Sequence, residues 1–270
     1  MRLFVLSPFV ALLMGATLLM GSGPAAAADP AAPLAAHRAL YQLTLDQARG
    51  TDVAGATGTM AYEVVDACDG WATRQRLQMT VTNRDGQDIE MLSDYTTWES
   101  KDGLNMRFRM RQTTETAVTS EVAGSATLEH TGGPGEAQYT APETATRKLP
   151  AGTLFPTAHT EAILAAARAG KKFITLPLFD GTSEKGAQDS SVAIFSWNGP
   201  QPNQWPDLAK LPSGRVHVAF FDHDADGQQP DYEVGMRYWD NGVADDLDMD
   251  FGDFVMKGAL SQLTVLPSGC

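Results

Sequence analysis

The chain alternates apolar and polar residues over much of its length, and this period of two limits the folds open to it. The stretches 37–45, 74–83 and 104–112 each place apolar side chains on one side of an extended chain and polar side chains on the other, as Phe108 and Arg109 illustrate. Strands with one buried and one solvated face belong to antiparallel sheets, because parallel sheets bury both faces. The sequence therefore predicts an all-β, mainly antiparallel fold.

Turn signals separate these stretches and indicate hairpins. The clearest is Asn241-Gly242, which lies between two alternating runs, 233–240 and 243–251. Further strands are expected near residues 53–66, 88–99, 116–130, 136–149, 172–179, 190–198, 214–222 and 255–266.

One segment departs from the β pattern. Residues 156–172 are rich in alanine and leucine, begin at Pro156 and reach Gly170, which predicts a single short helix. The Pro-rich loop 198–214 adds at most one helical turn, around residues 207–210. Strand patterning continues on both sides of this loop, so one wrapped domain is favoured over two lobes.

The first 28 residues have the layout of a secretory signal peptide. Arg2 precedes a long apolar run, and small residues follow up to Ala28. A transmembrane anchor is the alternative, but nothing after Ala28 is apolar for long enough to cross a bilayer. We therefore expect a cleaved signal peptide (1–28) and a soluble exported domain (29–270) with no transmembrane segment.

Acidic residues outnumber basic ones, which excludes some partners. The formal net charge is −13, and it becomes −14 without residues 1–28, which contain Arg2 and no acidic residue. A chain this acidic repels phosphate backbones and anionic headgroups. We expect no nucleic-acid partner and no direct docking to acidic lipid.

The chain has two cysteines, Cys68 and Cys270. Export places them in an oxidising compartment, where two thiols in one chain usually pair. Their bridge would close a loop of about 200 residues and fasten the last residue to an early strand. Free or intermolecular thiols are the alternative.

Signatures of hydrolytic enzymes are missing from the sequence. There is no G-x-S-x-G elbow, no H-E-x-x-H and no C-x-x-C. The five histidines lie far apart without ligand-like spacing, and His159, in the first turn of the expected helix, suits a structural hydrogen bond to loop backbone better than catalysis. An oxidised Cys68 is no nucleophile. We expect no catalytic residues and no enzymatic activity.

Residues 222–233 match the ligand spacing of a calcium loop. Asp222, Asp224, Asp226 and Glu233 occupy its acidic positions, and Gly227 occupies the position of its turn glycine. The flanks, however, read as strands rather than helices. We expect a charged hairpin loop with no cofactor and keep calcium as the alternative.

A second acidic stretch lies in the run 243–251. Asp246, Asp248 and Asp250 alternate with apolar residues and therefore share one face of a strand. A solvated face is the preferred interpretation of this row, and a cationic partner is the alternative.

Several short segments, taken in order, resemble one known family. They are HRALYQLTL at 37–45, CDGW at 68–71, GTLFPTAHT at 152–160, LFDG at 178–181 and the block from Pro230 to the terminal cysteine. In order and spacing they are similar to the EipB-like family of periplasmic cell-envelope-integrity proteins, over nearly the whole mature chain.

The resemblance implies an oblong β-spiral, in which one long antiparallel sheet curls like an unclosed barrel with a helix beside it. It also implies a disulfide between Cys68 and Cys270 and a role in maintaining the envelope under stress. We expect a non-catalytic protein that acts through periplasmic or envelope protein partners. The alternative is a carrier that holds a lipid or lipoprotein acyl chain inside the curled sheet.

Overall fold

The computed structural model describes residues 32–50, 52–222, 229–267 and 270, and residues 32 to 270 form one compact unit. Within the described residues the chain forms fourteen strands and one helix. Their bounds are β1 His37–Ala48, β2 Val53–Asp66, β3 Gly70–Asn83, β4 Asp88–Ser100, β5 Asn105–Thr114, β6 Ala117–Leu128, β7 Gly135–Ala141, β8 Ala145–Leu149, α1 Pro156–Arg168, β9 Phe173–Leu178, β10 Gln188–Ile194, β11 Ser213–Asp222, β12 Tyr232–Trp239, β13 Ala244–Asp250 and β14 Phe254–Val265.

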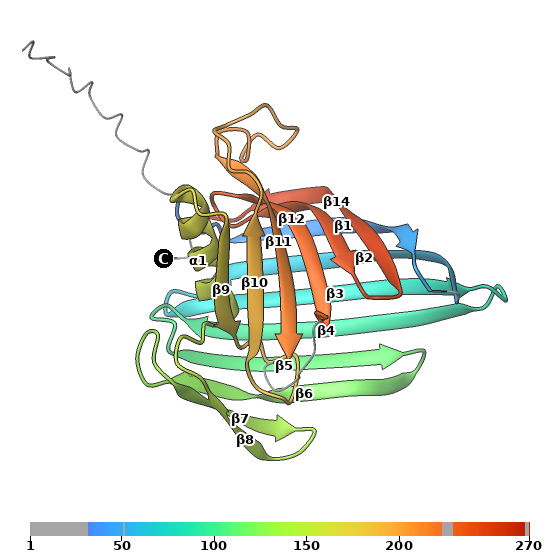
Figure 1. Cartoon of the computed structure of the whole chain (residues 1–270), viewed down its shortest axis with the longest axis horizontal. Helices are drawn as coiled ribbons and strands as arrows, with labels where there is room; N and C mark the ends of the chain where they lie inside the picture. Colours follow the sequence, from blue (N-terminus) through green and yellow to red (C-terminus); the bar gives the residue numbers. More distant parts are fainter. Residues whose placement is uncertain (1–31, 51, 223–228, 268–269) are drawn as a thin grey trace, which may run out of the picture. The chain divides into compact units, whose positions relative to one another are not determined.

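All the strands belong to one antiparallel sheet that curls without closing (Figure 1). Its order is β8-β7-β6-β5-β4-β3-β2-β1-β14-β13-β12-β11-β10-β9, so two meanders meet where β1 pairs with β14. The strands β8 and β9 follow each other in the sequence but form the two opposite edges. The predicted all-β, unclosed and curled antiparallel sheet is confirmed.

The period of two decides which side chains enter the curl. On β5, Met106, Phe108 and Met110 are buried, whereas the residues between them are exposed. The buried set packs with β6, β7 and β8 around Phe155 and Phe179. A larger apolar cluster joins α1 and β1–β3 to β10–β14.

One predicted strand was wrong. The expected strand 136–149 is two strands, β7 and β8, joined by a turn at 142–144. Pro142 lies in this turn, and a proline has no N–H to donate to a strand ladder. The prediction followed the alternation on both sides and disregarded the proline, which indicates the break.

The helix α1 forms where the sequence predicted one, and it ends at Arg168, two residues before Gly170. Ile163, Leu164 and Ala167 are buried as its apolar stripe. Gly170 adopts a positive φ of 71° just beyond the end, a conformation that glycine tolerates. The expected turn near 207–210 is a single turn, in which the Ala209 N–H donates to the Trp205 carbonyl.

The chain between β8 and β9 connects the two sheet edges. The Gly152 N–H donates to the Gly132 carbonyl in the turn between β6 and β7. The Leu154 N–H donates to the Pro177 carbonyl of β9, and the Phe179 N–H donates to the Leu154 carbonyl. The helix α1 follows directly, and Figure 1 shows it beside β9 at one end of the strands.

The predicted disulfide between Cys68 and Cys270 is confirmed. Cys68 lies in the turn between β2 and β3, and Cys270 ends the segment that follows β14. Since β1 pairs with both β2 and β14, the bridge fastens two strands on either side of β1.

Removing this bridge should destabilise the fold. The cysteines are 202 residues apart, and a bridge over so long a loop restricts the unfolded chain strongly. We expect Cys68→Ser with Cys270→Ser to lower the free energy of unfolding by about 2–5 kcal/mol, measured by urea denaturation. Reductant should shift the wild-type midpoint and leave the double variant unchanged. A wild-type midpoint that ignores reductant would show that the bridge contributes nothing.

Candidate functional site

The curled sheet encloses a cavity of about 700 Å³. Its wall comes from β1–β6 on one side and from β11–β13 on the other, and α1 and the segment before β10 complete it. The cavity therefore lies between the two meanders, inside the curl.

Apolar side chains form much of the cavity wall. They come from β2, β3, β5, β11, β12, β13 and α1, and they are buried. These residues are Met60, Leu77, Met110, Ile163, Val218, Met236, Leu247 and Met249. Methionine side chains are flexible, so this wall suits an occupant of variable shape.

Five tyrosine rings add to the apolar surface of the cavity, and the hydroxyls of two of them bond to backbone carbonyls. The Tyr41 hydroxyl donates to the Ala244 carbonyl at 2.7 Å, and the Tyr95 hydroxyl donates to the Asp180 carbonyl at 2.5 Å. Burial raises the pKa of every cavity tyrosine above its usual value, so all are neutral at physiological pH. These tyrosines are Tyr41, Tyr62, Tyr95, Tyr232 and Tyr238.

One end of the cavity lies against the first turns of α1, where Thr157, His159 and Thr160 line the wall; we call it the α1 end. Glu99 of β4 is 2% exposed, and its Oε2 accepts a hydrogen bond from the Thr157 N–H at 2.8 Å. Phe155, the residue before α1, supplies no capping side chain. Glu99 therefore caps the helix from a neighbouring strand.

The second carboxylate oxygen of Glu99 has no such partner. Among the described residues, nothing bonds to Glu99 Oε1 or to Thr97 Oγ1, and both atoms are buried. Thr97 lines the cavity at the α1 end and precedes Glu99 by two residues on the inner face of β4. Burial raises the pKa of Glu99 to about 7, although the hydrogen bonds with Thr157 oppose this shift.

His159 and Ser190 form a buried pair that resembles a catalytic dyad, but the hydrogen bond between them runs in the opposite direction, from histidine to serine. The Ser190 hydroxyl donates to the Leu176 carbonyl at 2.8 Å. His159 Nε2 lies 2.7 Å from Ser190 Oγ, so the imidazole N–H donates to the serine. Burial lowers the pKa of His159 to about 4. His159 thus holds α1 to β10, rather than bonding to loop backbone as the sequence suggested.

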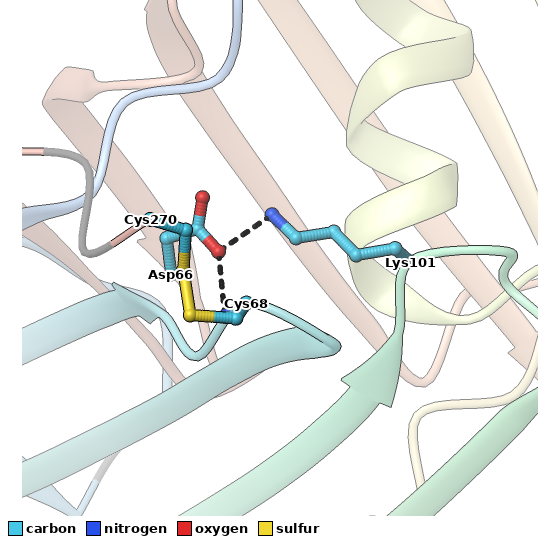
Figure 2. Close-up of a disulfide and its surroundings, with 4 residues drawn as sticks. All are labelled: Asp66, Cys68, Lys101 and Cys270. Atoms are coloured by element: carbon cyan, nitrogen blue, oxygen red, sulfur yellow. Dashed lines mark hydrogen bonds and ion pairs between the residues drawn. A yellow bond between two sulfur atoms is a disulfide. The ribbon is translucent and has the colours of Figure 1, made fainter.

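The disulfide is connected to the cavity wall (Figure 2). The Asp66 carboxylate accepts a hydrogen bond from the Cys68 N–H at 3.0 Å. It also forms an ion pair with the Lys101 ammonium at 2.9 Å. The Lys101 ammonium lies 3.3 Å from the centre of the Trp71 ring, and Trp71 lines the cavity. These contacts tie the bridged turn to one wall of the cavity.

The structure places only part of the candidate calcium loop. Asp224 and Asp226 lie outside the described residues. Of the other two carboxylates, Asp222 pairs with Lys185 at 2.6 Å, and Glu233 accepts from His217 at 2.6 Å. In the described part of the chain, no three acidic, histidine or cysteine residues are grouped to hold a metal ion. The absence of bound calcium stays a prediction.

The acidic row of β13 is paired within the sheet and is not simply solvated. Asp248 binds both Arg215 and Lys257, and Asp246 binds Arg215. Asp250 pairs with Arg49 at 2.7 Å. The cationic partners of this row are therefore residues of the same chain.

The sequence interpretation missed the cavity residues of β4. Inward positions of this strand are Ser93, Tyr95, Thr97 and Glu99, a mainly polar set where a packed core requires apolar side chains. Alternation within 88–99 already placed them on one face, and their polarity was the available signal for a cavity.

Three comparisons with known proteins agree. Residues 28–267 match the family model described as EipB-like. A relative from Brucella abortus (strain 2308), named "Cell envelope integrity protein EipB", is 34% identical over 266 residues, which cover 94% of this chain and 93% of the relative. A solved structure from Brucella abortus, described as a beta-barrel-like protein of a domain of unknown function, is 31% identical with a TM-score of 0.79, covering 88% of this chain and 100% of that chain.

No helix within the described residues is long and apolar enough to span a membrane. The predicted signal peptide, residues 1–28, lies outside the described part of the chain.

Replacing Glu99 should change how stability depends on pH. The folded protein holds the Glu99 proton up to about pH 7, whereas the ordinary carboxyl pKa is 4.5, so Glu99 favours folding at low pH and loses this contribution as pH rises through 7. We expect the wild-type stability, minus that of Glu99→Gln, to fall by about 2–3 kcal/mol between pH 4 and pH 8. Urea denaturation of both proteins measures this difference, and His159 contributes equally to each. A difference in stability that stays the same from pH 4 to pH 8 would contradict the raised pKa of Glu99.

Proposed function

The chain belongs to the EipB-like family, and we propose that it maintains the cell envelope as a non-catalytic periplasmic protein that holds an apolar chain in its cavity. The name of the Brucella abortus relative supports the envelope role. The cavity inside the curled sheet is the observation that carries the binding role. The sequence favoured action through protein partners. Because of the cavity, we now prefer the carrier hypothesis.

The proposed location follows from the disulfide and the predicted signal peptide. Disulfides form and persist in oxidising compartments such as the periplasm. The bridge between Cys68 and Cys270 therefore fits a protein that folds after export.

The size and lining of the cavity fit a flexible apolar ligand. Ligand pockets are commonly about 300–1,000 Å³, and this cavity of about 700 Å³ lies within that range. Each buried methylene contributes about 0.8 kcal/mol, so a chain of a dozen carbons supplies substantial affinity without any specific contact. The acyl chain of a lipid or lipoprotein has this chemistry.

The hydrogen bonds around Ser190 support a non-catalytic role. A nucleophilic serine needs a base that accepts its proton, but the Ser190 hydroxyl donates to Leu176 and accepts from His159. The proposal requires neither a catalytic residue nor a cofactor.

Action through protein partners is the second candidate, and two exposed aromatic residues favour it. Phe173 is 60% exposed on the edge strand β9, and Phe195, just after β10, is 67% exposed. Phe173 pairs with Ala193, two residues before Phe195, so the two residues belong to neighbouring segments at this side of the sheet. Large exposed apolar side chains in one place are typical of contact surfaces.

Narrowing the cavity should weaken ligand binding. Gln75 lines the cavity, whereas Gln78 is exposed on the outer face of the same strand, β3. We expect Gln75→Trp to weaken binding of a neutral fluorescent apolar probe, N-phenyl-1-naphthylamine, at least ten-fold, while Gln78→Trp binds like the wild type. Fluorescence titration measures both, and circular dichroism checks that each variant is folded.

Native mass spectrometry of protein released gently from the periplasm separates the two candidates. Co-purified acyl chains that are present in the wild type and lost in Gln75→Trp support the carrier. An empty wild type that binds no probe would leave envelope protein partners as the better account.

A further inference from the structure

Uncharged polar side chains form one part of the cavity wall, on the inner faces of β3 to β6. Ser93 of β4 pairs with Gln112 of β5, and Gln112 pairs with Ser120 of β6, so these residues form a row across three neighbouring strands. Gln75 of β3 pairs with Tyr95, two residues from Ser93 on the same inner face. We call Gln75, Ser93, Gln112 and Ser120, which all line the cavity, the polar patch.

The polar patch lies where the cavity opens to solvent. Gln112 is the one exposed residue among the described residues that line the cavity, and a residue that both lines a cavity and reaches solvent marks its opening. Ser93 is six residues along β4 from Glu99, which caps α1, and six residues of a strand span about 20 Å. The opening therefore lies away from the α1 end.

The side chains of the polar patch are accessible and have no partner within the described chain. Gln112 is exposed, and the other three residues are half-buried. No hydrogen bond joins any of the four side chains to another described residue. Amide and hydroxyl groups donate as well as accept hydrogen bonds, so the patch suits a ligand with several donors and acceptors.

Three half-buried aromatic rings line the cavity on its other wall. The rings of Phe220 on β11 and Tyr232 on β12 stack with their centroids 6.1 Å apart. The centroid of the Phe251 ring, just after β13, lies 5.6 Å from that of Tyr232. All three rings line the cavity and together form an aromatic surface.

Contacts of the segment before β10 bring the rings and the polar patch to the same part of the cavity. The Tyr95 hydroxyl donates to the Asp180 carbonyl, and the Gln188 amide donates to the Asp180 carboxylate at 2.9 Å. Gln188 pairs with Asp222 of β11, two residues beyond Phe220. Asp180 therefore connects the β4 wall, beside the polar patch, to the end of β11, beside the rings.

The charges of the lining favour an uncharged group here. None of the described residues that line the cavity is lysine or arginine. Asp180 is the one carboxylate among them, and it already accepts hydrogen bonds from Thr182 and Gln188. A carboxylate or phosphate at the polar patch would lose hydration and meet no cation in this lining, whereas a neutral group with many hydroxyls needs none.

We infer that the ligand carries a sugar as its head group, and that this sugar lies at the opening between the polar patch and the three rings, while its alkyl or acyl chain lies along the apolar wall. A sugar offers several hydroxyls to amide and serine side chains, and its C–H groups suit the negative face of an aromatic ring. The inference rests on the proposed function, because it names the class of ligand for the same cavity.

Four probes with the same twelve-carbon chain test the inference: dodecanol, dodecyl β-D-glucoside, N-dodecanoylglycinamide and dodecyl phosphate. Each displaces N-phenyl-1-naphthylamine from the chain without residues 1–28, at concentrations too low for micelles, and the dissociation constants are compared. Gln112→Leu removes the amide at the opening, and because Gln112 is exposed we expect an unchanged melting temperature. Gln78→Leu, on the outer face of β3, is the matched control.

We expect the wild type to bind the glucoside at least about three-fold more tightly than dodecanol, more tightly than the glycinamide, and to bind dodecyl phosphate most weakly. In Gln112→Leu the affinity for the glucoside should fall about 3- to 10-fold, the usual range for one hydrogen bond, while the affinity for dodecanol stays the same or rises. Gln78→Leu should bind all four probes like the wild type.

A glucoside that binds no more tightly than dodecanol, or whose affinity survives Gln112→Leu, overturns the inference while leaving cavity binding intact. Tightest binding of the glycinamide would assign the polar patch to an acylated peptide, and tightest binding of dodecyl phosphate would assign it to an anionic head group, so either result overturns the inference as well. No displacement by any probe, together with no binding of the fluorescent probe itself, overturns the proposed function and the inference with it.

Discussion

The pairing of β1 with β14 is the constraint on which the rest of the structure depends. The other described strands pair with their neighbours in sequence, so hairpins alone would give two separate meanders. The ladder between β1 and β14 joins these meanders. It runs from the pair His37 and Val265 to the pair Ala48 and Phe254, and it brings together segments more than 200 residues apart. Ordering such distant segments costs chain entropy, which the disulfide between Cys68 and Cys270 reduces by linking the same region covalently. This central junction places the free edges at β8 and β9, which only the segment carrying α1 connects.

The cavity follows from that arrangement. Both meanders turn apolar faces inward, but α1 and the segments around Phe155 and Phe179 keep them from packing together everywhere. What remains is a space lined by apolar and polar side chains, with the first turns of α1 against part of its wall. The same helix that connects the sheet edges needs a cap, and β4 supplies it with Glu99. The residues that complete the fold therefore also shape the site, whose described lining contains neither lysine nor arginine.

Local patterns in the sequence predicted the local structure well, but they predicted contacts between residues far apart in the sequence poorly. Alternation predicted the strands and their buried faces, because side-chain direction in a strand depends on nearest neighbours alone. The helix was predicted from composition, and the family resemblance implied the curl and the disulfide. The division of 136–149 escaped notice because its alternation outweighed Pro142. The capping by Glu99 joins residues 58 apart, which no local pattern reveals. The polar inward positions of 88–99 did hold a usable signal, since a buried polar row in a strand indicates a lumen more readily than a core.

The central claim is that the cavity binds an alkyl chain, and methyl NMR of the methionines tests it most directly. Met60, Met110, Met236 and Met249 line the cavity, whereas Met91 is 39% exposed and lies outside the lining. With ¹³C-methyl-labelled methionine, a titration with dodecanol should shift the four cavity resonances together with one dissociation constant and leave Met91 unchanged. Shifts confined to Met91, or no shifts at saturating dodecanol, would contradict the account.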